Sequence, residues 1–152
     1  MTKRILFVCL GNICRSPTAT GVFRARAEAA GLDAHADGAG AGAWHVGEPP
    51  DPRAREEAAK RGYDLSALRA RQVTALDFGH YDLILAMDRS NLAALERIRP
   101  AHARARLALF LDYAPDQPRR EVPDPYYEGG FDLALDLIET ASDGLIAEIR
   151  GG

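Results

Sequence analysis

Cysteine is scarce in this chain, and long apolar runs are missing from it. The 152 residues include two cysteines, too few for the disulfide framework that stabilises small secreted proteins. No segment approaches the roughly 20 apolar residues that a membrane-spanning helix needs. The apolar start over residues 5–10 loosely imitates a signal peptide, but Gly11 and Asn12 end it without a convincing cleavage pattern. We therefore expect a cytoplasmic protein with no membrane association.

A surplus of positive charge is also missing. The formal net charge is −3 at pH 7, and the arginines are interleaved with acidic residues and alanines. The field of the whole molecule therefore gives no reason to expect binding to nucleic acid. Length and an ordinary apolar fraction favour one globular domain over residues 1–152, with a core of its own. We expect a monomer or a weak dimer.

Strand and helix signals alternate along the chain. Apolar runs predict strands over 4–9, 81–87 and 106–111, with a weaker strand over 34–37. Helical spacing and capping signals predict helices over 16–31, 52–62, 88–98 and 131–149, the first three capped by Ser16, Asp51 and Asp88. Strands separated by helices indicate an α/β fold with a parallel sheet, in which ligands bind beyond the carboxyl ends of the strands.

The loop Cys9-Leu10-Gly11-Asn12-Ile13-Cys14-Arg15-Ser16 lies at such a strand end and precedes Pro17, which can open a helix. Backbone amides and the positive end of a helix dipole gather around an anion in this context. A free thiol is only about 3% ionised at pH 7, so a nucleophilic thiolate needs such amides and a nearby guanidinium. Arg15 supplies that guanidinium and offers a planar fork for two phosphate oxygens. The loop therefore indicates a cysteine that attacks phosphorus.

Cleavage of a phosphate ester also requires an acid that protonates the leaving group. Asp124 is the best candidate, because it follows the last predicted strand and lies between two prolines that stiffen its loop. Taken alone, this residue would be better explained as a turn aspartate. Its pairing with the Cys9 loop favours the catalytic explanation.

These two motifs resemble those of the low-molecular-weight protein tyrosine phosphatases. Further similar segments are Trp44-His45, Asp51-Pro52-Arg53-Ala54 and Ala86-Met87-Asp88, so the resemblance extends over essentially the whole chain. It implies a three-layer α/β/α fold with a four-stranded parallel sheet and a flavodoxin-like, doubly wound topology. It also implies hydrolysis without a metal or other cofactor, acting on a phosphotyrosine-containing protein, for which a tyrosine kinase is one candidate.

The resemblance also implies a role for each site residue. Cys9 would form a cysteinyl-phosphate, Arg15 would hold the phosphoryl oxygens, and Asp124 would act as general acid and then as general base. Asn12 would brace the loop, and Ser16 would stabilise the thiolate. The substrate would contact the loop residues Leu10, Gly11, Asn12, Ile13, Cys14 and Ser16. Trp44, Tyr126 and Tyr127 lie in predicted rim loops, and from that placement we expect them to form aromatic walls around the substrate.

Other chemistries fit the sequence less well than phosphotyrosine hydrolysis. A phosphoarginine phosphatase of the same fold tends to carry threonine where this chain has Ile13, whose apolar bulk favours a flat aromatic ring. Arsenate reductases of this fold need additional cysteines for their disulfide relay. A zinc site would need a second pair of ligands, and the four histidines are scattered and are expected to be solvated or packed. A phosphate-binding module without turnover would need neither Cys9 nor Asp124.

Two departures from the family pattern fall behind the loop. Members often carry a serine where this chain has Gly38 and a histidine where it has Leu68, and these groups usually complete a hydrogen-bond network with Asn12. We therefore expect backbone groups or water to hold Asn12 here. Cys14 has two explanations: a small buried residue that packs the loop, or the partner of Cys9 in a protective disulfide, which the resemblance favours.

Overall fold

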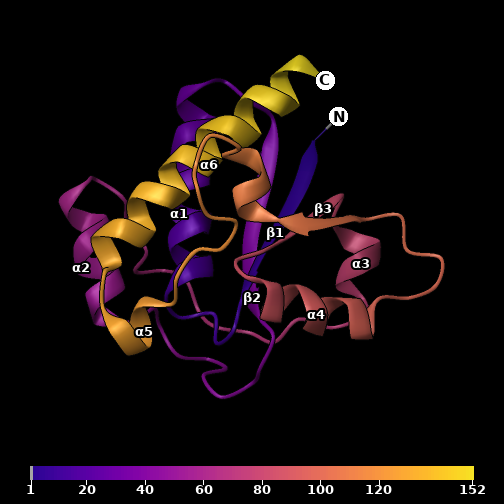
Figure 1. The fold of residues 1–152 in the computed structure, drawn as a ribbon, viewed down its shortest axis with the longest axis horizontal. Coiled ribbons are helices and arrows are strands. Elements are labelled where there is room, and N and C mark those ends of the chain that lie inside the picture. The colour runs from indigo at the N-terminus through magenta and orange to yellow at the C-terminus, as the bar shows by residue number, and fades with distance from the viewer. Residues whose placement is uncertain (1) are drawn as a thin grey trace.

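The computed structural model describes residues 2–152, apart from the side chain of Glu128. Strands and helices alternate along the chain, as Figure 1 shows. The elements are β1 (Lys3–Cys9), α1 (Arg15–Ala29), β2 (Ala34–Gly40), α2 (Pro52–Lys60), α3 (Asp77–His80), β3 (Leu83–Ala86), α4 (Arg89–Ile98), β4 (Arg106–Leu109), the 3₁₀ turn η1 (Phe110–Tyr113), α5 (Pro125–Glu128) and α6 (Phe131–Gly151).

The four strands form one parallel sheet in the order β2-β1-β3-β4. Alternate residues of β1 pack into different layers: Ile5 and Phe7 face the core under α1, α2 and α6, whereas Leu6 and Val8 face the core under α3 and α4. Both faces of the sheet are therefore buried, as is usual for parallel sheets. The expected three-layer α/β/α architecture is confirmed.

The capping signals identify two of the three helix starts. Asp51 accepts a hydrogen bond from Arg53 N and caps α2, and Asp88 accepts one from Asn91 N and caps α4. The expectation that Ser16 caps α1 is wrong. That helix begins two residues earlier than a Ser16 cap would require, at Arg15, and its N-cap is Cys14. The Ser16 hydroxyl contacts Cys9 instead.

Several strand boundaries also differ from the sequence prediction. The first strand begins one residue early, at Lys3, and the third covers Leu83–Ala86 where 81–87 was expected. The second strand runs on to Gly40 because β1 pairs with it along its full length, up to Cys9 opposite Gly40. A Cβ atom at Gly40 would lie 3.0 Å from the Gly11 carbonyl carbon, so glycine allows this strand end to approach the loop. The last strand ends at Leu109, where the chain turns into η1.

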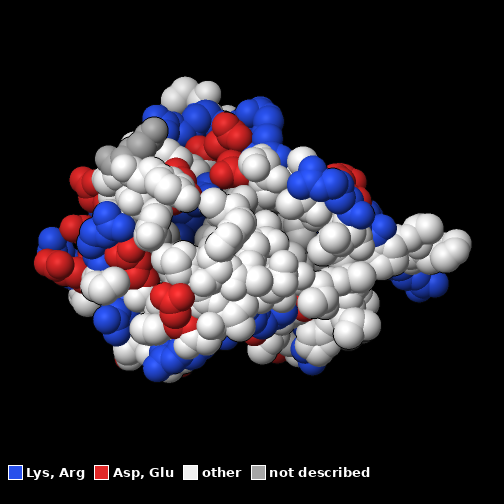
Figure 2. Space-filling model, turned by 90° about the horizontal axis from the view of Figure 1, so that it is seen from below, with Lys and Arg blue, Asp and Glu red and all other residues white. Residues whose placement is uncertain are grey.

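The carboxyl ends of β1 and β3 bring Cys9 and Asp88 to one edge of the sheet. Figure 2 shows the underside of the molecule in Figure 1. There, mainly uncharged residues surround a hollow in which atoms of lysine or arginine are visible. Among residues 2–152, no helix is both long and apolar enough to cross a membrane.

Candidate active site

Residues 10–14 form a tight loop between β1 and α1. Asn12 has a φ angle of 58° and is the one described residue other than glycine with a positive φ. Asparagine tolerates this left-handed conformation better than most residues. The loop is also held from outside, because Ala41 N donates to the Cys9 carbonyl (2.8 Å) and Asp51 N donates to the Ile13 carbonyl (2.7 Å).

The Cys9 sulfur is buried and lies within reach of two hydrogen-bond donors. Asn12 N donates to Cys9 Sγ over 3.3 Å, and the Ser16 hydroxyl lies 3.1 Å from the same atom. Hydrogen bonds of this kind stabilise a thiolate relative to a thiol. The sulfur also stands just before the N-terminus of α1, where the helix dipole favours negative charge.

Arg15 is 2% exposed and is held by acceptors from two other loops. Its Nη1 donates to Asp88 Oδ2 (2.7 Å) and to the Val122 carbonyl (3.0 Å), and its Nη2 lies 3.4 Å from Asp124 Oδ2. Burial acts to lower the pKa of Arg15, but negative charge at Cys9 and the hydrogen bond to Asp88 outweigh it and raise that pKa. The guanidinium is therefore a fixed positive charge beside the sulfur.

Asp124 lies at the same edge of the site. Its Oδ1 accepts a hydrogen bond from Tyr126 N (3.1 Å), so the side chain is the N-cap of α5. The flanking prolines are Pro123 in the preceding loop and Pro125 at the first position of the helix. Asp124 thus stands beside Arg15 in a locally rigid segment.

A cavity of about 330 Å³ opens over the sulfur. Two aromatic side chains at its mouth are largely exposed, Trp44 and Tyr127 at 71% each. Most of the residues predicted to contact substrate line this cavity, and its full lining is Cys9, Leu10, Gly11, Ile13, Cys14, Arg15, Trp44, His45, Asp124, Tyr126 and Tyr127. Asn12 and Ser16, which were also predicted to contact substrate, lie behind the loop and do not line it.

Comparison with known proteins identifies the family. Residues 4–151 match the family model described as low molecular weight phosphotyrosine protein phosphatase. The chain belongs to this family. A low molecular weight protein-tyrosine-phosphatase of Streptomyces coelicolor is 47% identical over 99% of this chain and 95% of that protein.

Solved structures agree with this assignment. The crystal structure of YfkJ from Bacillus subtilis superimposes with a TM-score of 0.95 and 39% identity, covering 99% of this chain and 96% of that one. A Drosophila arginine phosphatase superimposes with a TM-score of 0.91 at 29% identity, covering 96% and 97% of the two chains. The fold alone therefore does not separate tyrosine from arginine substrates.

Sequence reasoning missed two residues of this phosphatase's site. His45, expected to be solvated or packed, lines the cavity: its ring would lie 2.9 Å from a Cβ atom at Gly11, and its Nδ1 lies 3.1 Å from Glu48 Oε2. Asp88, expected as a helix cap, both caps α4 and binds Arg15. The signal for Asp88 was available, because the residue follows a buried strand at the edge where Cys9 lies.

The Asn12 side chain is held behind the loop by a backbone group, in agreement with the expectation from the sequence. Its Oδ1 accepts a hydrogen bond from the backbone amide of Arg71 (3.1 Å), and its Nδ2 donates to the Ser16 hydroxyl (2.6 Å). A Cβ atom at Gly38 would lie 2.9 Å from Asn12 Nδ2, and Leu68 packs against the apolar core. A backbone group thus holds the carboxamide, as predicted.

Cys14 differs from Cys9 in its electrostatic surroundings. It is buried in a small apolar cluster with Ile13 and Ala70. Burial, reinforced by the negative charge of Asp51, raises the pKa of the Cys14 thiol well above its ordinary value. Cys14 therefore stays protonated at neutral pH. Across residues 2–152, no three histidine, cysteine or acidic side chains converge to form a metal-binding group.

Proposed function

We propose that this phosphatase hydrolyses phosphotyrosine with Cys9 as nucleophile, Arg15 as phosphate ligand and Asp124 as general acid and base. The convergence of these three side chains on one cavity carries the proposal. Arg15 Nε supports it further, since this buried N–H has no hydrogen-bond partner among the described residues. A phosphoryl oxygen would satisfy it.

The reaction has two steps. The Cys9 thiolate attacks phosphorus, a sulfur–phosphorus bond forms, and the phosphorus–oxygen bond to the tyrosine breaks as Asp124 gives its proton to the phenolate oxygen. Water then attacks the cysteinyl-phosphate, Asp124 takes a proton from that water, and phosphate leaves as the Cys9 thiolate returns. Asn12 N and Ser16 stabilise the thiolate at both stages, given their contacts with the sulfur.

Ile13 favours tyrosine over arginine as the substrate residue. It lines the cavity with apolar bulk, and Tyr126 and Tyr127 stand at the mouth with their rings edge to face, 5.0 Å apart. Such walls suit a flat aromatic ring. We propose in addition that residues 1–152 act as one cytoplasmic catalytic domain, monomeric or weakly dimeric, with a tyrosine kinase among its substrates.

Activity on an aryl phosphate tests the chemistry. We predict that Cys9→Ser abolishes turnover, whereas Asp124→Ala slows substrates with poor leaving groups by about 10²–10⁴-fold and those with good leaving groups much less. The measurement is kcat on a series of aryl phosphates of increasing leaving-group pKa. Substantial turnover by Cys9→Ser would refute the assignment of Cys9 as the nucleophile. Faster hydrolysis of phosphoarginine than of phosphotyrosine would refute the substrate assignment.

A further inference from the structure

The residues from the last turn of α4 to the start of β4 concentrate positive charge on a chain whose net charge is −3. Four arginines fall within residues 97–106, and no acidic residue occurs between Glu96 and Asp112. None of the four forms an ion pair with a described residue. The connecting loop projects from the body of the molecule in Figure 1.

This loop borders a groove of about 640 Å³ whose other wall is α3 and the turn before it. Leu76 stands on that wall and is 85% exposed, the largest exposed fraction of any large apolar side chain described. Phe78, Tyr81 and Ala105 are buried beneath it, and His102 and Arg104 stand on the loop side. The groove thus has an exposed apolar side chain, Leu76, on one wall and the Arg104 guanidinium on the other.

The groove lining carries one arginine, Arg104, and one carboxylate. Asp82 is the one acidic residue of its lining, and its Oδ2 accepts a hydrogen bond from Arg4 N over 2.8 Å. Arg99 donates to the Ala105 carbonyl over 3.0 Å and so braces the loop. Arg104 is exposed and has no side-chain hydrogen bond or ion pair with a described residue.

The groove is separate from the active site. Tyr81 and Asp82 come just before β3, and Arg104 and Ala105 come just before β4, so the groove lies at the amino ends of these strands. Cys9 lies at the carboxyl end of β1, which runs parallel to them. A ligand in the groove therefore leaves the cavity over the sulfur open.

We propose that this groove binds an acidic segment of a partner protein that carries an apolar side chain. The apolar side chain would lie against Leu76, and flanking carboxylates would contact Arg104, His102 and the neighbouring arginines. Charge complementarity of this kind raises association rates and selects partners. Nucleic acid fits less well, because single strands bind through exposed aromatic faces, and the aromatic rings here, Phe78 and Tyr81, are buried.

The proposal is tested by direct binding, without catalysis. The probe is a short, fluorescein-labelled, unphosphorylated peptide in which glutamates flank a central leucine, and fluorescence anisotropy gives its Kd. We expect Arg104→Glu to weaken binding by about tenfold or more and Leu76→Ser to weaken it by about threefold to tenfold. Both side chains are exposed, so neither change removes a core contact.

Matched controls separate this surface from general charge and from the active site. Arg150→Glu makes the same charge change at an exposed, unpaired arginine at the end of α6 and should leave Kd unchanged. Cys9→Ser should also bind the peptide normally, so a failure of the proposed hydrolysis is distinguishable from a failure here. Equal binding by Arg104→Glu, equal affinity for a lysine-substituted peptide, or tighter binding of a single-stranded oligonucleotide would overturn the proposal.

Discussion

At the scale of single residues, Asn12 has two structural roles in the loop, one through its backbone and one through its carboxamide. Its backbone adopts the left-handed conformation, with φ 58°, that turns the amide toward the Cys9 sulfur. Its carboxamide connects the Arg71 amide to the Ser16 hydroxyl, which also contacts that sulfur. Gly38 and Leu68 provide no hydrogen-bonding side chain behind it, so the carboxamide depends on these two partners.

Substitutions at Asn12 separate the role of its backbone conformation from the role of its carboxamide. Asn12→Gly keeps access to positive φ and removes the carboxamide, whereas Asn12→Ala also adds backbone strain of about 1–2 kcal/mol. We predict that both variants lower kcat on an aryl phosphate by about tenfold, or about 1.4 kcal/mol, because Ser16 is no longer oriented. Thermal unfolding should show Asn12→Ala to be the less stable variant. Equal stability of the two would mean that the positive φ is not required.

At the scale of elements, the N-terminus of α2 connects the Cys9 loop to the segment that carries Asp124. Asp51 N donates to the Ile13 carbonyl, and the Asp51 carboxylate binds the Arg53 guanidinium through both oxygens (3.0 and 2.9 Å). Arg53 in turn lies 3.4 Å from the Tyr126 carbonyl and stacks over the rings of Tyr126 and Phe131. Arg53 is thus a positioning residue for α5.

Loss of this guanidinium should affect protonation of the leaving group. We predict that Arg53→Met lowers kcat by about threefold to tenfold on substrates with poor leaving groups and changes kcat little on substrates with good leaving groups. This selective effect is expected because Arg53 contacts Tyr126, and the backbone amide of Tyr126 donates the hydrogen bond that orients the Asp124 carboxylate. Lys60→Met, an exposed position of the same helix, is the matched control. An equal loss on all leaving groups would contradict a role through Asp124.

The elements show why part of this structure could be predicted from the sequence. Asp51 and Asp88 were identified because a cap followed by helical spacing is a local signal. The Cys9 loop was identified because a buried strand, a glycine and a helix-opening proline occur together. The position of His45 against Gly11, the last residues of β2 and the short α3 depend on contacts between distant segments. No local pattern encodes such contacts, because their energies come from tertiary packing.

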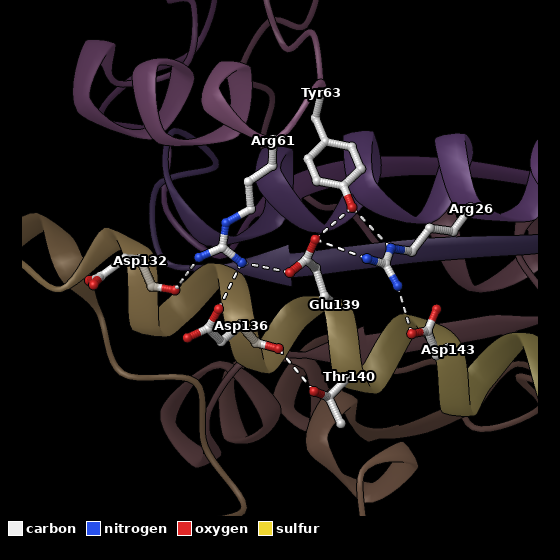
Figure 3. A network of polar contacts seen from close by, with 8 residues as sticks. All are labelled: Arg26, Arg61, Tyr63, Asp132, Asp136, Glu139, Thr140 and Asp143. Carbon is white, nitrogen blue, oxygen red and sulfur yellow. Dashed lines mark hydrogen bonds and ion pairs between the residues drawn. The ribbon is translucent and has the colours of Figure 1, made fainter.

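At the scale of the whole molecule, a polar network fixes α6 across α1 and the end of α2 (Figure 3). Glu139 on α6 is its centre: it accepts hydrogen bonds from the Tyr63 hydroxyl (2.7 Å), from Arg26 (2.9 Å) and from Arg61 (2.6 Å). Since α1 begins at Arg15, this network holds the helix that carries the proposed phosphate ligand. It also joins residues that are far apart in the sequence.

The network predicts how stability depends on pH. Burial acts to raise the pKa of Glu139, but hydrogen bonds from Tyr63 and Arg61 and the charge of Arg26 outweigh it and hold that pKa below its ordinary value of 4.5. A carboxylate with a depressed pKa in the folded state contributes stability above its unfolded pKa and loses it as the pH falls through its folded pKa. We therefore predict that Glu139→Gln lowers the free energy of unfolding at pH 7 by about 1–3 kcal/mol.

Denaturant unfolding across pH distinguishes this network from ordinary surface charge. The deficit of Glu139→Gln relative to the unsubstituted protein should be constant from pH 7 down to the unfolded pKa of Glu139 and should shrink below it, because both proteins then carry a neutral group at this position. Asp136→Asn is the control: this carboxylate is 63% exposed and binds Arg61 alone, so its effect should stay within about 0.5 kcal/mol. A deficit for Glu139→Gln that does not change with pH would show that the lost stability comes from packing, and that the charge of Glu139 does not hold α6 in place.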